Sequence, residues 1–169
     1  EASMDGILVV DEAGQMTSFN QRFVAMWGIP DEVVVLRSDA RALQSVRDLL
    51  EDPDDYIEKV NYLHAHHDET NRNEILLKDG RTIDRYTAPV VGADSRYYGR
   101  IWQFRDITDY KRAQENIRKS EAAYREIFNA VTEAIFIHDL YTGEILDVNN
   151  SMLEMFGYVR EDVWRLSVG

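Results

Sequence analysis

The segment HAHHDET, residues 64–70, contains the residue types that proteins use to bind transition metals. His64, His67 and Asp68 have the spacing i, i+3, i+4, which would place them on one face of a helix. Two imidazoles and a carboxylate on one face could bind zinc. The alternative is a solvated helix end, where protonated histidines interact favourably with the helix dipole. We favour this alternative and predict no metal site.

Several other kinds of chemistry lack the residues they need. The chain has no cysteine, which excludes disulfides, thiolate metal sites, thiol nucleophiles and chromophores held through sulfur. It also has no Ser-His-Asp candidate set and no phosphate-binding loop, so a hydrolytic enzyme is unsupported. A net charge of −12 argues against binding to a nucleic-acid backbone.

The sequence shows no membrane contact of its own, since it has no run of about 18 apolar residues. The absence of cysteine fits a cytoplasmic location. The sequence begins with Glu1, and we expect it to be a piece of a longer protein.

The first 107 residues alternate between strand and helix patterns in a recognisable order. Hydrophobic alternation bounded by turn residues predicts five strands, at residues 6–11, 15–20, 73–78, 82–91 and 97–107. Helical patterns cover residues 21–27 and 31–66, and Pro53 starts a new helix within the second range. Antiparallel strands with the helices grouped between them predict an α+β domain.

The segment Asp5–Val34 is repeated, with one extra turn residue, at Glu133–Val163. The identical pairs are Ile7/Ile135, Asp11/Asp139, Gly14/Gly143, Asn20/Asn149, Met26/Met155, Gly28/Gly157, Glu32/Glu161 and Val34/Val163. Both copies therefore predict a strand, a glycine turn, a second strand and a helix. The asparagines are placed to cap the two helices, and Gly28 and Gly157 to end them.

The fifth strand runs into a long charged helix through the motif FRDIT, with almost no loop between them. We predict that the Thr108 hydroxyl caps this helix, that Asp106 bonds back to the same helix start, and that Asp109 lies in its positive first turn. Apolar and small residues then follow a heptad spacing: Tyr110, Ala113, Ile117, Ser120, Tyr124, Ile127 and Val131. We call this set the seam. It predicts a parallel coiled-coil dimer, and the alternative is that it packs on the sheet of its own chain.

Together these features resemble the PAS domain family. The most specific are FRDIT followed by the charged helix, and KDGR at the start of the second hairpin. The resemblance implies a five-stranded antiparallel sheet in the order 2-1-5-4-3, with helices over one face and a long coiled-coil-like helix after it. It divides the chain into a PAS domain at residues 1–108, a linker helix at 109–131 and the N-terminal part of a second PAS domain at 132–169. We expect the hairpin of this second part to need a surface from another chain, because the given sequence supplies it with no fifth strand.

The same resemblance places a pocket between the sheet and its helices. Strand alternation puts Ile83, Arg85 and Thr87 on one face of their strand. The predicted lining is Ile75, Leu77, Ile83, Arg85, Thr87, Arg100, Trp102 and Phe104. Arg85 and Arg100 would suit a small anion such as a carboxylate or a phosphate. The equally weighted alternative is a filled core in which the arginines pair with internal acids such as Asp11.

The resemblance also implies a function. It indicates a non-catalytic sensory input and dimerisation module of a bacterial protein, with a histidine kinase, a diguanylate cyclase or a phosphodiesterase as output domain. Asp106 and Thr108 would relay the signal, and the partners would be a second copy and the output domain of the same chain. The cofactor stays open: a small anion or non-covalent flavin is compatible with the sequence. Haem is disfavoured. In haem-binding members of the family, the iron is held by a histidine on this helix, whereas the histidines of residues 64–67 lie at its very end. The alternative is a scaffold that mediates protein–protein interaction alone.

Overall fold

The computed structural model describes residues 4–164 and forms two compact units that meet between Arg112 and Ala113. The outer limits predicted for the two domains, at residues 1 and 169, lie outside the described residues. Each unit is described by itself below.

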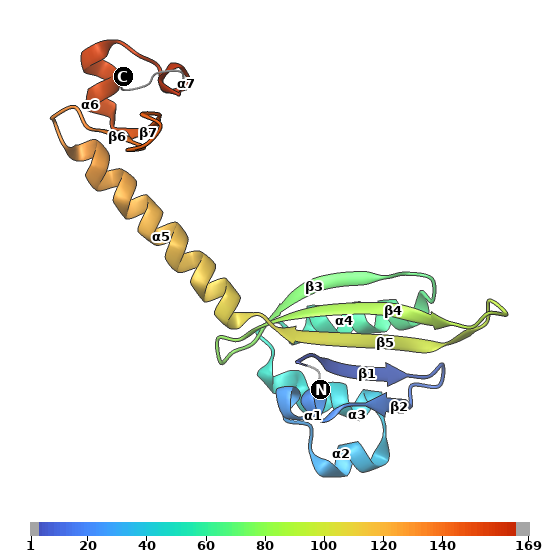
Figure 1. Ribbon diagram of the computed structural model, residues 1–169. Helices are drawn as coiled ribbons and strands as arrows, with labels where there is room; N and C mark the ends of the chain where they lie inside the picture. The colour runs from blue at the N-terminus through green and yellow to red at the C-terminus, as the bar shows by residue number, and fades with distance from the viewer. Residues whose placement is uncertain (1–3, 165–169) are drawn as a thin grey trace. The chain divides into compact units, whose positions relative to one another are not determined.

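The first unit is built on a five-stranded antiparallel sheet (Figure 1). Its strands are β1 (Gly6–Val10), β2 (Met16–Phe19), β3 (Asn71–Leu76), β4 (Thr82–Val91) and β5 (Tyr97–Asp106). Their spatial order is β2-β1-β5-β4-β3, which confirms the predicted topology. The two longest strands, β4 and β5, pair from Ile83 and Asp106 to Val91 and Tyr97, and β5 is the central strand of the sheet.

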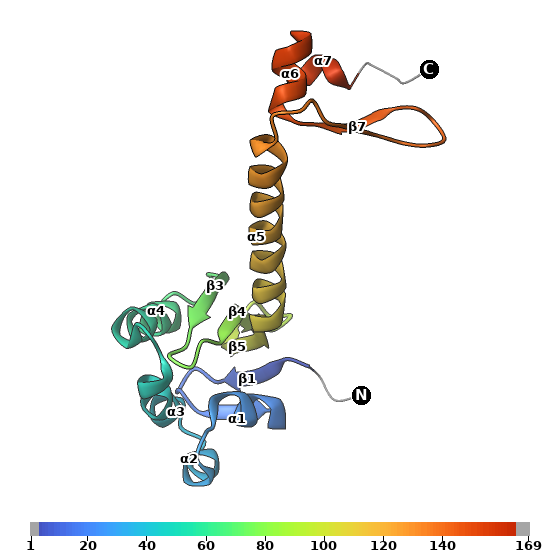
Figure 2. The ribbon, with the colours of Figure 1, turned by 90° about the vertical axis from the view of Figure 1, so that its left-hand side faces the viewer.

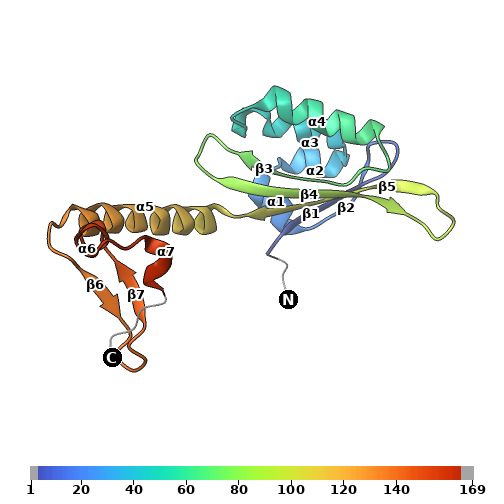
Figure 3. The same ribbon diagram turned by 90° about the horizontal axis from the view of Figure 1, so that it is seen from above.

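Four α-helices and one 3-10 turn connect β2 to β3: α1 (Gln21–Trp27), α2 (Asp31–Leu36), α3 (Asp39–Val46), η1 (Arg47–Leu49) and α4 (Pro53–Ala65). Figure 3 shows α2, α3 and α4 on one side of the sheet. The helical pattern predicted across residues 31–66 is therefore interrupted. Arg37 ends α2 in the left-handed region, at φ 49°. Leu50 is extended because it forms a bridge with Leu77 of the hairpin that follows β3.

The core of this unit lies between the sheet and these helices. Every helix except the 3-10 turn contributes buried side chains to it, among them Trp27 of α1, Val33 of α2, Val46 of α3 and Tyr56 of α4. The strands supply the opposite wall, from residues at alternate positions, as period-two alternation predicts. One continuous apolar cluster therefore holds the helices against the inner face of the sheet.

Asn20 fastens the first strand to the first helix. Its Oδ1 accepts hydrogen bonds from the N–H groups of Ile7 and Phe23, each at 2.9 Å, and its Nδ2 donates to the Asp5 carbonyl at 2.8 Å. The side chain is therefore both the predicted helix cap and a bracket around the strand start.

The second unit repeats the order of strand, turn, strand and helix with which the first unit begins (Figure 2). It contains β6 (Phe136–His138), β7 (Ile145–Val148), α6 (Asn150–Phe156) and α7 (Arg160–Val163). Asn149 accepts from the N–H groups of Ile135 and Met152, at 2.8 and 3.0 Å, and donates to the Glu133 carbonyl at 2.8 Å. These bonds match those of Asn20, so the sequence repeat is a structural repeat.

A single residue, Ile107, separates β5 from the long helix α5 (Thr108–Ala130). The helix has 23 residues, and a long helix after the sheet is what the sequence predicted. Among the helices of residues 4–164, none is long and apolar enough to cross a membrane.

The side chain of Asp5 is bonded to β5, the central strand of the sheet. Its carboxylate accepts two hydrogen bonds from Arg105, both at 2.7 Å, and a third from the Gln103 amide. The bidentate bonds from Arg105 lower the pKa of Asp5, and its partial burial opposes that shift without cancelling it. The chain start is thus attached to β5 close to its junction with α5.

The Asn20 bracket predicts a large effect from a small change. In Asn20→Ala, two N–H groups and one carbonyl lose their partner, so the free energy of unfolding should fall by about 2–3 kcal/mol. Urea unfolding followed by tryptophan fluorescence measures it. Asn61→Ala, at an exposed position of α4, is the matched control and should change stability little. A loss for Asn20→Ala no greater than for the control would contradict the bracket.

The Asp5 contact predicts a pH-dependent term in stability. Because the folded-state pKa of Asp5 is lowered, its contribution is complete above the unfolded-state pKa and is lost as pH falls through the folded value. The melting temperature of the wild type should therefore exceed that of Asp5→Asn at neutral pH, and the gap should shrink between about pH 5 and pH 3. Circular dichroism at several pH values tests this. Asp68→Asn, at an exposed position, is the control, and a gap for Asp5→Asn that stays constant over this range would disprove the link.

Candidate functional site

The eight residues predicted to line a pocket all lie on the inner side of the first unit. Their side chains are no more than 5% exposed: Ile75, Leu77, Ile83, Arg85, Thr87, Arg100, Trp102 and Phe104. Strand alternation therefore places them together, but contact with a ligand remains a prediction.

The space enclosed by the helices is mostly filled by aromatic side chains. Trp27 packs edge-on against Phe104, at 5.2 Å between ring centroids, and Tyr56 lies 6.2 Å from Trp27. The cavity that remains among them has a volume of about 30 Å³. This is roughly the space of one water molecule. A flavin or haem ring system does not fit the cavity as it stands.

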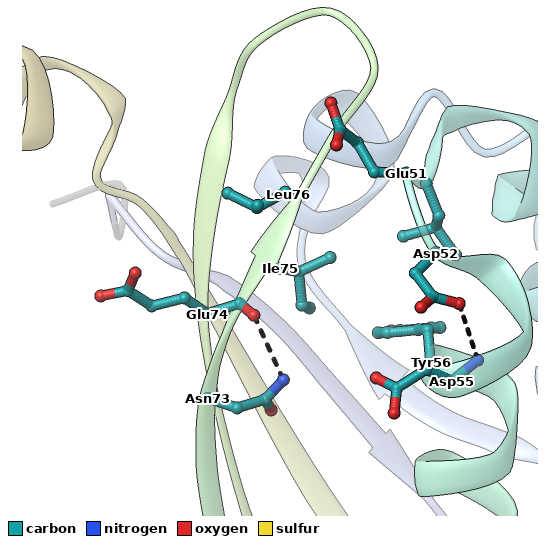
Figure 4. Close-up of a pocket in the computed structure, with 9 residues that line it drawn as sticks. Glu51, Asp52, Asp55, Tyr56, Asn73, Glu74, Ile75 and Leu76 are labelled. Atoms are coloured by element: carbon teal, nitrogen blue, oxygen red, sulfur yellow. Dashed lines mark hydrogen bonds between the residues drawn. The ribbon is translucent and has the colours of Figure 1, made fainter.

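A larger cavity, of about 280 Å³, opens between α4 and β3. Figure 4 shows its lining, in which Asn73 and Ile75 come from β3, Tyr56 comes from α4, and the carboxylates of Glu51, Asp52 and Asp55 lie on the α4 side. Tyr56 also lines the small inner cavity. Its ring is therefore the wall that the two cavities share.

Arg100 is buried, and both of its terminal nitrogens donate hydrogen bonds. Nη1 donates to the Glu69 carbonyl and Nη2 to the His66 carbonyl, both at 2.9 Å, and the Thr87 hydroxyl is 3.4 Å away. This guanidinium group thereby fixes the connection from α4 to β3 on the sheet.

Arg85 is equally buried but only partly satisfied. Its Nε donates to Asn73 Oδ1 at 2.9 Å, and its Cζ lies 5.0 Å from the ring of Tyr56 and 5.3 Å from that of Trp102. Among residues 4–164, Nη1 and Nη2 make no hydrogen bond of good geometry, and the side chain of Tyr56 is their nearest polar neighbour and interacts with the guanidinium group. Burial lowers the pKa of Arg85 and raises the pKa of Tyr56, while the charge of Arg85 opposes the shift at Tyr56.

One of the two alternatives, a filled core, included pairing of these arginines with an internal acid such as Asp11, and that pairing is wrong. Asp11 instead accepts hydrogen bonds from the N–H groups of Ala13 and Gln15, both at 2.9 Å, because it closes the turn between β1 and β2. Within the described part of the chain, neither Arg85 nor Arg100 forms an ion pair.

The histidine segment does not form a shared helical face, because α4 ends at Ala65. His64 contacts Asp39 at 3.0 Å, while His67 stacks on Tyr97 with 4.0 Å between centroids. His66 bonds to the Tyr62 carbonyl at 2.8 Å. In residues 4–164, no group of three or more histidine, aspartate or glutamate side chains is arranged to hold a metal.

The corner between β5 and α5 differs from the prediction in one bond. Asp106 does bond back to the helix start, since Oδ1 accepts from the Thr108 N–H at 3.0 Å. The Thr108 hydroxyl, however, does not cap its own helix. It donates to Asp106 and accepts from the Thr82 N–H of β4 at 3.0 Å. Because the Ile107 N–H also donates to the Thr82 carbonyl, at 2.9 Å, both backbone groups of Thr82 are held by the corner.

Of the eight residues predicted to line a pocket, only Ile75 lines the larger cavity and only Phe104 lines the inner one. Tyr56 and Asn73 are among the lining residues that the prediction missed. Asn73 could have been found from the hairpin, because antiparallel pairing about the Asp79-Gly80 turn places it opposite Arg85. Tyr56 has no such signal, since its contact with Arg85 depends on how α4 crosses the sheet.

The chain matches models of known protein families. A family model described as "PAS fold" matches residues 2–115, and a second, described as "PAS domain", matches residues 122–168. No curated protein matches the chain.

Several solved structures are similar. The sensor region of a sensor histidine kinase is 22% identical, with a TM-score of 0.49, and the match covers 63% of this chain. This chain spans only 40% of the length of that one. The PAS domain of BvgS from Bordetella pertussis is 19% identical over 70% of this chain and 90% of that one, with a TM-score of 0.48. A sensory box histidine kinase/response regulator from Burkholderia thailandensis is 18% identical over 73% of this chain and 92% of that one, with a TM-score of 0.45.

The sheet order, the covering helices and a family model that spans most of the chain lead to one conclusion. The chain belongs to the PAS family.

Proposed function

We propose that the chain is a sensory input and dimerisation module of a bacterial signal-transduction protein in the cytoplasm. It would pass the state of its first domain through α5 to an output domain of the histidine kinase, diguanylate cyclase or phosphodiesterase type. The observation that carries the proposal is the corner at Thr108, which ties the start of β4 to the start of α5. PAS domains are in general non-catalytic sensory modules.

The relay depends on a short mechanical path. β4 and β5 carry the buried residues Arg85, Arg100 and Trp102, so a change at these side chains displaces the central strands. Thr82 begins β4 and is bonded to Ile107 and Thr108, so a shift of this strand acts directly on the first turn of α5. The ion pair between Glu74 and Lys111 adds a second contact at 2.6 Å, but its exposure makes it weak.

Dimerisation would bury the seam of α5. Tyr110, Ile117 and Ile127 are 65%, 68% and 69% exposed in the single chain. Large apolar side chains repeated on one face of a charged helix favour a coiled coil with a second copy. Ala113 and Ser120 fill little space, which makes the seam weak and favours two packings of similar free energy.

The alternative function is a scaffold that senses nothing. It is favoured by the small volume of the inner cavity, about 30 Å³, because a filled core needs no ligand. The two arginines that are buried without an ion pair among residues 4–164 argue against it, because they cost stability that an apolar filled core would not.

The dimer proposal predicts the result of one substitution in the seam. Ile117→Asp would bury a carboxylate at the interface, so the wild type should sediment as a dimer at tens of micromolar and the variant as a monomer. Ala122→Asp introduces the same charge at an exposed position on the opposite face of the helix and should leave the dimer intact. A monomeric wild type at this concentration would refute the coiled coil.

The relay proposal predicts that Thr108 matters through its hydroxyl. Thr108→Val removes the acceptor for the Thr82 N–H, at a cost of about 1–2 kcal/mol in stability. In the full-length protein, the output of the variant should no longer follow the signal, whereas Thr108→Ser keeps the hydroxyl and should respond. Measuring output with and without signal in both variants decides this. A normal response of Thr108→Val would show that the corner is not the relay.

A further inference from the structure

The repeat between the two units changes character at one position in the second strand of each copy. Asp147 of β7 corresponds to Ser18 of β2, while the helix caps two residues later, Asn149 and Asn20, are identical. Ser18 is exposed, whereas Asp147 is only 8% exposed. A buried carboxylate where the other copy has an exposed hydroxyl indicates that something covers this face of β7.

The cover is the C-terminal part of α5. Arg125 Nη1 donates to both carboxylate oxygens of Asp147 at 2.9 Å, and the Tyr124 hydroxyl donates to the same group at 3.3 Å. Phe128, one turn further along the helix, is 7% exposed, and its ring stacks on that of Tyr124 with 5.2 Å between centroids. These helix residues and β7 belong to the same compact unit, which begins at Ala113. The end of α5 is therefore a structural part of the second unit.

Asp147 also receives contacts from its own strand and from α7. The Val148 N–H donates to its carboxylate at 2.9 Å, and Arg160 Nη1 lies 3.3 Å away. Burial alone would raise the pKa of Asp147, but the hydrogen bonds from Arg125 and from the Val148 N–H outweigh burial, so the pKa is lowered. The carboxylate is thus charged at neutral pH, and it joins α5, β7 and α7.

Other bonds between the helix and the rest of the unit involve neutral groups. Asn129 Oδ1 accepts from the Asn150 N–H at 3.0 Å, and the Val131 carbonyl accepts from the Ser151 hydroxyl at 2.7 Å. They lie where the chain itself already joins the helix to the hairpin. The contacts of Asp147 begin about one turn earlier on the helix and give a second point of attachment. Two points along a helix determine how an attached body is rotated about it.

We propose that Asp147 holds the second unit at a fixed rotation about α5, so that the helix end and the hairpin of β6 and β7 turn as one body. This inference rests on the sensory function proposed above and names the place where a motion of α5 is received. Asp147 is a positioning residue, because turning away from Arg125 would leave its buried charge without its main partner. The contact leaves Ile117 and Ile127 exposed, so it is compatible with a dimer through the seam.

The test measures this rotation within one chain. Because the chain has no cysteine, Ala123→Cys on α5 and Leu146→Cys on β7 can carry two spin labels at exposed positions. The full chain also carries Ile117→Asp, so that no distance arises between two copies. Double electron–electron resonance should give a single narrow distance distribution. Asp147→Asn keeps the shape of the side chain but removes its charge, and it should broaden the distribution because the second unit is free to turn.

Amide exchange gives a second measurement on the same chains. In Asp147→Asn, the amides of residues 121–130 should exchange at least about tenfold faster, as expected for the loss of a charged hydrogen bond. The amides of β4 and β5 in the first unit serve as the internal reference and should not change.

The pH dependence separates a charged contact from simple packing. Because the folded-state pKa of Asp147 is lowered, the contact is complete above the unfolded-state pKa and is lost as pH falls through the folded value. With Asp147 present, the distance distribution should therefore broaden below about pH 4. Arg125, Arg160 and Tyr124, the ionisable groups that contact the carboxylate, do not titrate in this range. Asp147→Asn should already be broad at pH 7.

Two further variants make the result decisive. Glu154→Gln, at an exposed position of α6, is the matched control and should keep the narrow distribution. Arg125→Gln removes the charged partner from the helix side, where the side chain is 43% exposed, and should broaden the distribution even if Asp147→Asn does not fold.

A narrow distribution in Asp147→Asn or in Arg125→Gln would overturn the inference, and so would a broad one at pH 7 when both residues are intact. The proposed relay and the proposed dimer fail separately, because they are judged by Thr108→Val in the full-length protein and by sedimentation.

Discussion

Two positive charges buried on the inner face of one sheet shape most of the first unit. A buried guanidinium group needs hydrogen-bond acceptors. Arg100 finds them in two backbone carbonyls, and these bonds hold the connection between α4 and β3 in place. Arg85 meets this need only in part, through Asn73 and two aromatic faces. The two guanidinium groups therefore connect the sheet to α4 and to the segment that follows it, through the His66 and Glu69 carbonyls and the ring of Tyr56.

Local patterns in the sequence were enough to predict the strands, most of the helices and the asparagine cap that occurs in both units. The alternation along β4 and β5 identified the buried face, and Asn20 and Asn149 were recognisable as caps from their place before a helix. The strand order came from the resemblance to a family, since pairing between β1 and β5 leaves no local trace in the sequence.

The errors came from contacts between residues distant in sequence. The Thr108 hydroxyl bonds to Thr82, 26 positions away, instead of to its own helix. His64 turned toward Asp39 because α4 and α3 lie together, which no spacing rule within one helix can express. The sequence could not decide between an open pocket and a filled core, because cavity volume depends on how Trp27, Tyr56 and Phe104 interdigitate after the helices are placed.

The direct passage from β5 to α5 through Ile107 has a consequence for how such a chain can vary. With a single residue between strand and helix, no flexible loop can absorb a change in length. Each residue added to the helix turns everything after it by about 100° about its axis. For a chain that dimerises through its seam, the azimuth of whatever follows is therefore set by a residue count. Insertions or deletions of whole heptads would preserve that phase, while any other length would present a different side of the helix to the partner.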